Sequence, residues 1–284
     1  MIRFGVHCSL RDGLTGALEE AHRLGCEAMQ IFTRSPRMWK MKPPLPGAVA
    51  EFNFRRNEMD IYPLVVHTPY LPNLATSDPA LYRSSKTCLR EDITLSEQLN
   101  ADYLVIHPGS YSPDSTPEAG IENVSAAINE VLAAVPGKTV ILLENAAGGG
   151  RRLAGTVQEL AAMMKGIKDK ERIGICFDTA HALAAGFDLA TPQGIDAALD
   201  EYDRGVGLEN LKILHCNDSL APLGSKRDRH QHLGKGCVGQ KGFKYLIKCL
   251  NGVAEAGILE TPKDSEKADE RNLRRLFSWR KAVA

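Results

Sequence analysis

Histidine and acidic residues recur in this sequence wherever a short apolar run ends. A polar side chain stands at or beside the end of such a run eight times, at His7, Thr33, His67, His107, Glu144, Asp178, His215 and Glu260. Burying this many unpaired imidazole and carboxylate groups would cost several kcal/mol each. Bound metal ions or mutual partners would remove that cost, so the pattern indicates a shared site rather than eight separate structural roles.

Two further pairs have the spacing of metal ligands. Asp178 and His181 form D-x-x-H where a strand is expected to run into a helix, and Asp228 and His230 form D-x-H on an extended segment, where residues two apart point the same way. The plausible ligands are then His67, His107, Glu144, Asp178, His181, His215, Asp228, His230 and Glu260. Imidazole and carboxylate suit zinc or manganese, and one tetrahedral zinc takes about four ligands. The set therefore predicts more than one ion, an arrangement that recurs in phosphodiester hydrolysis.

The apolar runs that carry these residues are expected to be strands of one parallel sheet. They span Arg3–His7, Ala28–Phe32, Pro63–His67, Tyr103–His107, Val140–Glu144, Gly174–Asp178, Lys212–Cys216 and Gly257–Glu260. Most are almost continuously apolar, which is typical of strands buried on both faces. Amphipathic stretches between them predict helices over 14–24, 80–99, 118–135, 156–165, 192–206, 241–250 and 266–283.

This alternation predicts an α/β fold, a single (β/α)8 TIM barrel over residues 1–284, with the metal site at the C-terminal mouth of the strands. An open doubly wound sheet is the structural alternative. Because no G-x-G-x-x-G follows a strand, nothing indicates a nucleotide cofactor.

Composition excludes several classes of protein. The hydrophobic fraction of 43% excludes intrinsic disorder, and no apolar run approaches the ~20 residues of a membrane helix. The N-terminus does not read as a secretory signal, and seven cysteines without a C-x-x-C pair favour reduced thiols and a cytoplasmic protein. Lys+Arg and Asp+Glu balance at 35 each, so an anionic partner must be attracted locally.

Seven segments of the chain resemble the endonuclease IV family. They are HTPYLPNLA from His67, HPGS at 107–110, ENAAG at 144–148, CFDTAHALAAGFD at 176–188, HCNDS at 215–219, SKRDRHQHLGKG at 225–236 and LETP at 259–262. They occur in the family's order and cover nearly the whole chain. The family comprises zinc-dependent apurinic/apyrimidinic (AP) endonucleases of base-excision repair.

The resemblance implies a trinuclear zinc site, with manganese able to replace zinc at some positions. His67 and His107 would bind the first zinc, and Glu144 would bridge it to the second. Asp178, His215 and Glu260 would complete the second, and His181, Asp228 and His230 would hold the third. The implied reaction is attack of a metal-bound hydroxide on the phosphorus 5′ to an abasic site, leaving a 3′-hydroxyl and a 5′-deoxyribose phosphate. Glu144 is expected to orient the nucleophile as well as to bridge.

The expected partner is double-stranded DNA that contains an abasic site, bound by a monomer. After the second predicted strand, Arg34, Arg37 and Trp39 lie in a basic loop, TRSPRMWKMK, suited to phosphates and to a gap in a base stack. The resemblance implies that Arg37 and Tyr70 wedge into the stack. Arg229 belongs to a second basic patch, with Lys226 and Arg227, beside the third zinc. An abasic nucleotide is the cheapest to flip out, which gives selectivity without sequence readout.

Some positions depart from the family's pattern. Arg151 and Arg152 follow three glycines where small or polar residues are commoner in the family, and His232 lies close enough to His230 in sequence to compete with it. Ala146, Gln231 and Lys235 also differ. The alternative function is a metal-dependent sugar-phosphate isomerase or epimerase of the xylose isomerase-like barrels. Such an enzyme needs one or two metals and has no use for the Asp228–His230 pair or the Arg37 loop.

Overall fold

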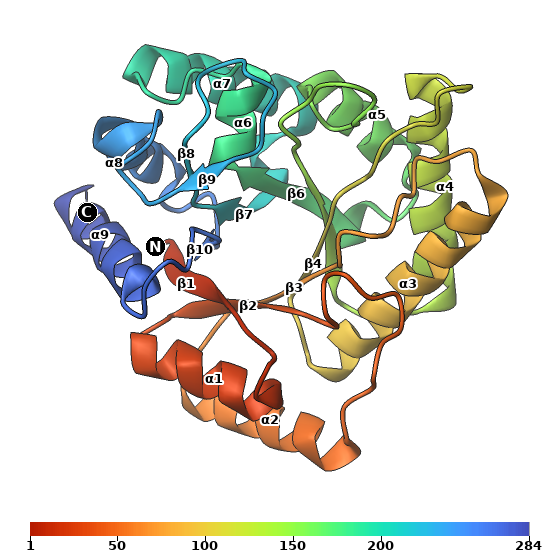
Figure 1. Cartoon of the computed structure of the whole chain (residues 1–284), viewed down its shortest axis with the longest axis horizontal. Coiled ribbons are helices and arrows are strands. Elements are labelled where there is room, and N and C mark those ends of the chain that lie inside the picture. The colour runs from red at the N-terminus through yellow and green to blue at the C-terminus, as the bar shows by residue number, and fades with distance from the viewer. Residues whose placement is uncertain (284) are drawn as a thin grey trace.

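Every apolar run forms a strand, and the eight parallel strands close on one another in chain order (Figure 1). The computed structural model describes residues 1–283. The strands are β1 (Arg3–Cys8), β2 (Ala28–Phe32), β3 (Leu64–His67), β4 (Tyr103–Ile106), β5 (Val140–Glu144), β6 (Ile173–Asp178), β7 (Leu211–His215) and β10 (Ala256–Leu259). β1 closes the barrel against β10, with Val6 opposite Leu259. The predicted (β/α)8 TIM barrel is confirmed.

The strands are apolar throughout because both of their faces are buried. Val65 belongs to a small cluster that fills the barrel interior, whereas its neighbour Val66 belongs to the larger cluster beneath the helices. Successive side chains of a strand point to opposite faces, so each strand supplies both clusters. This double burial explains why the sequence shows continuous apolar runs instead of alternation.

Helices surround the barrel (Figure 1). They are α1 (Gly13–Leu24), α2 (Pro46–Glu58), α3 (Pro79–Gln98), α4 (Pro117–Ala134), α5 (Val157–Gly166), α6 (Thr179–Ala185), α7 (Pro192–Val206), α8 (Gly239–Leu250) and α9 (Ala268–Val283). Local signals set several ends: Asp78 accepts hydrogen bonds from the first turn of α3, and Thr156 and Glu159 form a capping box on α5. Gly25 ends α1 in the left-handed conformation, at φ 75°.

Two features of the fold were not predicted. Helix α2 buries only Phe52 and Arg56 among its thirteen residues, so it has no apolar stripe to reveal it. A short antiparallel hairpin joins β8 (Asp218–Ser219) to β9 (His230–Gln231). This hairpin places the D-x-H segment over the mouth.

No helix within residues 1–283 is both long and apolar enough to cross a membrane.

Candidate metal centre

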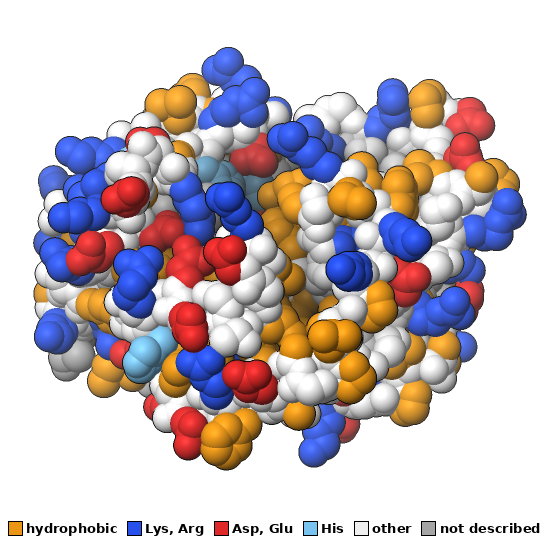
Figure 2. All heavy atoms as spheres, turned by 60° about the horizontal axis from the view of Figure 1, so that its bottom comes forward, with side chains coloured by type: hydrophobic (Ala, Val, Ile, Leu, Met, Phe, Trp, Pro, Cys, Tyr) orange, Lys and Arg blue, Asp and Glu red, His pale blue; other side chains and the backbone are white. Residues whose placement is uncertain are grey.

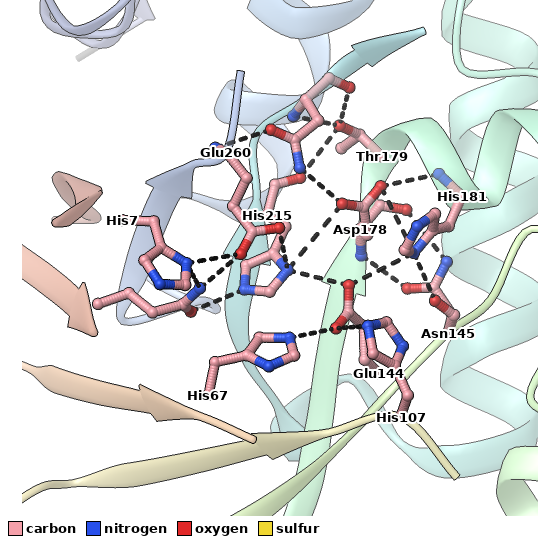
Figure 3. Close-up of polar contacts among 12 residues, drawn as sticks. His7, His67, His107, Glu144, Asn145, Asp178, Thr179, His181, His215 and Glu260 are labelled. Carbon is pink, nitrogen blue, oxygen red and sulfur yellow. Dashed lines mark hydrogen bonds and ion pairs between the residues drawn. The ribbon is translucent and has the colours of Figure 1, made fainter. Parts of the chain in front are cut away.

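The nine predicted ligands converge at the C-terminal mouth of the barrel, and Figure 3 labels all of them except Asp228 and His230. Four of them are the last residues of strands: His67 of β3, Glu144 of β5, Asp178 of β6 and His215 of β7. The other five lie just beyond the strands, with His107 after β4, Glu260 after β10, His181 on α6, Asp228 before β9 and His230 at its start. The parallel barrel therefore gathers at one mouth residues that are up to 193 positions apart in the chain, from 67 to 260.

The ligand atoms form three overlapping groups. Within each group, one ligand atom from every residue lies within 4.8 Å of the others: His67, His107 and Glu144; Glu144, Asp178, His215 and Glu260; Asp178, His181 and His230. Asp228 joins the third group, because its two carboxylate oxygens lie 3.2 Å from Nε2 of His181 and 3.2 Å from Nε2 of His230. Glu144 and Asp178 each belong to two groups, so the three groups form a connected series.

Glu144 is the common centre of four imidazole rings. Its Oε2 lies 3.1 Å from Nε2 of His67 and 3.4 Å from Nε2 of His107, and its Oε1 lies 3.0 Å from Nδ1 of His215 and 3.3 Å from Nδ1 of His181. The side chain is only 1% exposed. Burial alone would raise the pKa of this carboxyl, but His107 and His215 hold the pKa well below its usual range. Glu144 is therefore an anion with both oxygens directed at ring nitrogens.

Backbone carbonyls fix the orientation of three of the histidine rings. In three rings Nδ1 donates to a backbone carbonyl: His67 to Thr68 at 2.6 Å, His181 to Asn145 at 2.9 Å and His230 to Glu260 at 3.0 Å. In a neutral ring, a hydrogen on Nδ1 leaves the lone pair on Nε2, which faces Glu144 in His67 and Asp228 in His181 and His230. The backbone thus holds these rings ready to coordinate a cation.

Two polar residues that were not predicted position the second group. Gln30 of β2 accepts from Nε2 of His215 at 2.9 Å and donates to Oε1 of Glu260 at 2.6 Å. Asn217 donates to Oδ2 of Asp178 at 2.6 Å and accepts from the backbone N–H of Glu260 at 2.9 Å. The signal for Gln30 was a single amide inside the apolar run AMQIF. Such a buried amide needs partners, and here the ligands provide them.

His7, one of the eight polar residues at run ends, lies behind Glu260. Its Nδ1 is 3.1 Å from Oε1 of Glu260, and its Nε2 is buried without a hydrogen-bond partner. Burial lowers the pKa of His7 despite the carboxylate beside it. His7 thus supports a ligand and is not a member of the three groups.

The side chains of this centre present donor atoms that are suited to divalent cations. Nε2 of His230 is buried and has no hydrogen-bond partner, although carboxylate oxygens surround it. Burial disfavours a charged ring, but Asp178 and Asp228 raise the pKa of His230 to about 9. The site therefore attracts positive charge, and its imidazole and carboxylate donors are those that zinc and manganese take.

The predicted DNA contacts occupy different positions relative to this centre. Arg37 and Arg229 are exposed, Trp39 is 38% exposed and Tyr70 is 65% exposed. Tyr70 lies over the first group, with its ring 6.3 Å from that of His107. Figure 2 shows the surface hollowed along a groove lined by hydrophobic side chains, with histidine and basic side chains at its upper end. Four of the five predicted DNA-contacting side chains are thus accessible from outside.

Arg34 is the exception, and the predicted contact of Arg34 with DNA does not fit this structure. Its guanidinium is 1% exposed, forms an ion pair with the buried Asp92, and lies 2.9 Å from a carboxylate oxygen of Glu91. It also donates to the carbonyl of Trp39. Arg34 therefore links the basic loop to α3. Its buried guanidinium group is not accessible to a phosphate.

His232 lies outside the metal centre. Its ring faces Oδ2 of Asp264 at 3.0 Å and the amide of Asn272 at 2.9 Å. These partners keep it away from the third group, so it does not compete with His230.

The chain is similar to known proteins over nearly its whole length. The family model described as xylose isomerase-like TIM barrel matches residues 18–283. The probable endonuclease 4 of Halothermothrix orenii is 39% identical over 264 residues, which cover 93% of this chain and 95% of that protein. The probable endonuclease 4 of Methanoculleus marisnigri is 39% identical over 97% of this chain and 98% of its own length.

Two solved structures show how far the similarity extends. Endonuclease IV from Thermus thermophilus is 36% identical, with a TM-score of 0.86 over 99% of both chains. A D-tagatose 3-epimerase-like protein superposes with a TM-score of 0.78 at 22% identity, covering 99% of this chain and 98% of that one. A likeness at that identity shows the barrel fold alone.

Proposed function

Because the chain belongs to the endonuclease IV family, we propose that it is a DNA-repair endonuclease that hydrolyses the phosphodiester bond 5′ to an abasic site with three zinc ions at the barrel mouth. The observation that carries the proposal is the connected series of ligand groups, in which Glu144 and Asp178 are each shared by two groups. A carboxylate shared by two ligand groups would allow two cations to act on one phosphate group, which suits two-metal hydrolysis.

Each cation would have its own ligands. His67, His107 and Glu144 would hold the first. Glu144, Asp178, His215 and Glu260 would hold the second, and His181, Asp228 and His230 would hold the third. When bound, zinc lowers the pKa of water and neutralises the charge that develops on the phosphoryl and leaving oxygens.

The residues of the chain then bind and orient the substrate. The ionised Glu144, whose oxygens face four imidazole rings, would orient the attacking water. Arg37 and Tyr70, both exposed beside the mouth, would enter the base stack and leave the abasic nucleotide facing the metal centre. The products would be a 3′-hydroxyl and a 5′-deoxyribose phosphate.

The sugar-phosphate isomerase alternative explains less of the structure. Its representatives among solved structures share the barrel at 22% identity or below, whereas the endonuclease 4 relatives reach 39%. A one- or two-metal isomerase would also leave Asp228 and His230 without a use, although the β8–β9 hairpin places them against His181.

Strand cleavage tests the proposal. A labelled duplex with one abasic-site analogue is incubated with the protein, with the protein after chelation, and after zinc is restored. We expect incision directly 5′ to the analogue, loss of incision on chelation and recovery with zinc, with three metal ions per chain by elemental analysis. A folded protein that holds three metals and leaves the duplex intact would overturn the proposal.

A further inference from the structure

A basic pocket lies beside the metal centre, outside the three ligand groups. It has a volume of about 650 Å³ and contains three cations, Arg151, Arg152 and Lys226. The rest of its lining is Asn73, Ser110, Tyr111, Ser112, Pro113 and the glycines 148–150. No acidic side chain lines it, and among residues 1–283 none of the three cations forms an ion pair. Three like charges are thus held together without compensation from the protein.

The loop after β5 is built to hold this arrangement. Gly148, Gly149 and Gly150 all have positive φ, at 74°, 87° and 61°, a conformation that side-chain-bearing residues rarely adopt. A Cβ on Gly149 would lie 3.0 Å from Cβ of Lys226, so the glycine lets the lysine stem pack directly on the loop. The amino group of Lys226 also donates to the carbonyl of Ala185.

The two arginines are fixed to the neighbouring loop through their backbone. The carbonyl of Arg151 accepts from the N–H of Tyr111 at 3.1 Å, and Arg152 forms a β-bridge with Ser110. Their side chains are exposed, so the backbone of each arginine is held in place while its guanidinium group stays accessible. A rigid base with free donors is what a binding site for an oxyanion requires.

The basic pocket continues into the cavity that contains the metal ligands. The adjoining cavity, of about 470 Å³, is lined by His107, His181 and Asp228, and it shares Asn73, Ser110 and Arg152 with the basic pocket. A DNA strand whose cleaved phosphate lies at the ligands can therefore place another of its phosphates among the three cations.

We propose that the basic pocket holds one backbone phosphate of the DNA strand, distinct from the phosphate that is cleaved. The inference rests on the proposed function, and it adds Arg151 and Arg152 as positioning residues. One phosphate brings negative charge to three unpaired cations, and Ser110 and Ser112 offer further hydrogen bonds. Nothing in the pocket reads a base, so the contact is independent of sequence.

The test compares two double variants of equal charge. Arg151→Ser/Arg152→Ser removes the pocket's arginines, and Arg90→Ser/Arg204→Ser removes two exposed arginines from α3 and α7. Steady-state incision of the abasic duplex is measured from ~50 to ~200 mM salt. We expect the pocket variant to raise KM roughly tenfold with kcat unchanged. The slope of log(kcat/KM) against log[salt] should become shallower by about 1, the share of one phosphate contact. The control should keep the wild-type KM and slope.

The phosphate is located with duplexes that each carry one uncharged methylphosphonate. At one position of the methylphosphonate, kcat/KM of the wild type should fall to that of the pocket variant. The same duplex should not lower kcat/KM of the pocket variant any further. Equal KM and slope for both double variants, or no such position, would overturn the inference. Lys226→Ser gives a second reading, with a smaller rise in KM, if the double variant does not fold. Failure of the wild type to incise would instead count against the proposed function, and fluorescence anisotropy of the same duplexes would still test the pocket.

Discussion

The two ends of the barrel satisfy their charges in opposite ways. At the N-terminal end of the strands, buried arginines have partners within the protein: Arg56 donates to the carbonyl of Asn100 at 2.9 Å, and Arg172 donates to those of Thr139 and Val135 and to Glu97. At the C-terminal mouth, Glu144, Asp178, Asp228 and Glu260 form no ion pair with lysine or arginine within residues 1–283, and histidines are their only charged partners.

The difference shows which end is complete without a ligand. The charge of Arg172 is balanced by Glu97, and its other hydrogen bonds go to backbone carbonyls, so this end of the barrel needs no ligand to balance that charge. Carboxylates that face imidazole rings lack a permanent cation, and the centre becomes electrically balanced only with added positive charge. Barrels commonly divide stability and chemistry between these ends. Substitutions at the two ends should therefore have separable effects.

The largest effect should follow from Glu144→Gln, which removes the charge shared by two ligand groups. We expect incision of an abasic duplex to fall by roughly 10²- to 10³-fold or more, because an electrostatic group at the reacting centre is lost. Elemental analysis should show fewer than three metals per chain. Near-normal turnover at saturating zinc would mean that Glu144 neither bridges nor orients.

Gln30→Leu should weaken metal binding without removing a ligand. Gln30 contacts both His215 and Glu260, and loss of such a supporting group typically costs about 10- to 100-fold in metal affinity. Competition against a chelator measures the change. Gln158→Leu, at an exposed position on α5, is the control and should bind metal like the wild type. An unchanged affinity for Gln30→Leu would show that the mouth is held by its ligands alone.

Arg172→Met tests the opposite end. It leaves two backbone carbonyls without their donor and removes a partner of Glu97, so we expect a loss of roughly 2–4 kcal/mol in the free energy of unfolding. The kcat at saturating zinc should not change. Urea unfolding and incision are measured on the same preparation, beside Arg274→Met, where the arginine is 76% exposed and the expected change is within about 0.5 kcal/mol. A large fall in kcat would contradict the separation of the two ends.

The smallest effect concerns a carboxylate near the mouth that needs no metal. Asp78 accepts from the N–H groups of Leu81 and Ala80, and these lower its pKa in the folded protein. The unfolded chain then holds more protons, so the contribution to stability is present above about pH 4 and is lost as the pH falls through the folded pKa. The difference in urea midpoint between wild type and Asp78→Ala, measured with chelator, should shrink from pH 6 to ~3. Asp12, which makes no capping hydrogen bond before α1, provides the control.

The barrel, and the gathering of the candidate ligands at its mouth, could be predicted from the sequence because both leave local signals. A strand buried on both faces is a continuous apolar run, and a ligand at its end interrupts that run, as Val140–Glu144 illustrates. The role of Arg34 was not predictable, since Asp92 lies 58 residues away and only the packing of α3 brings the two together. Gln30 was missed for the same reason: its partners are the last residue of β7 and the residue after β10, and a lone amide in a strand does not reveal them.

The closure of β1 on β10 also sets when the metal centre exists during synthesis. β10 ends at Leu259, and the ligand Glu260 is the next residue. A ribosome that has made the first 250 residues has produced eight of the nine ligands, but the barrel is still open along one seam and the second ligand group is incomplete. Closing that seam pairs β1 with β10, the strand pair with the largest separation in the sequence, so it requires residues that are synthesised late. A nascent chain that stops before β10 therefore lacks both the closed barrel and the complete second ligand group.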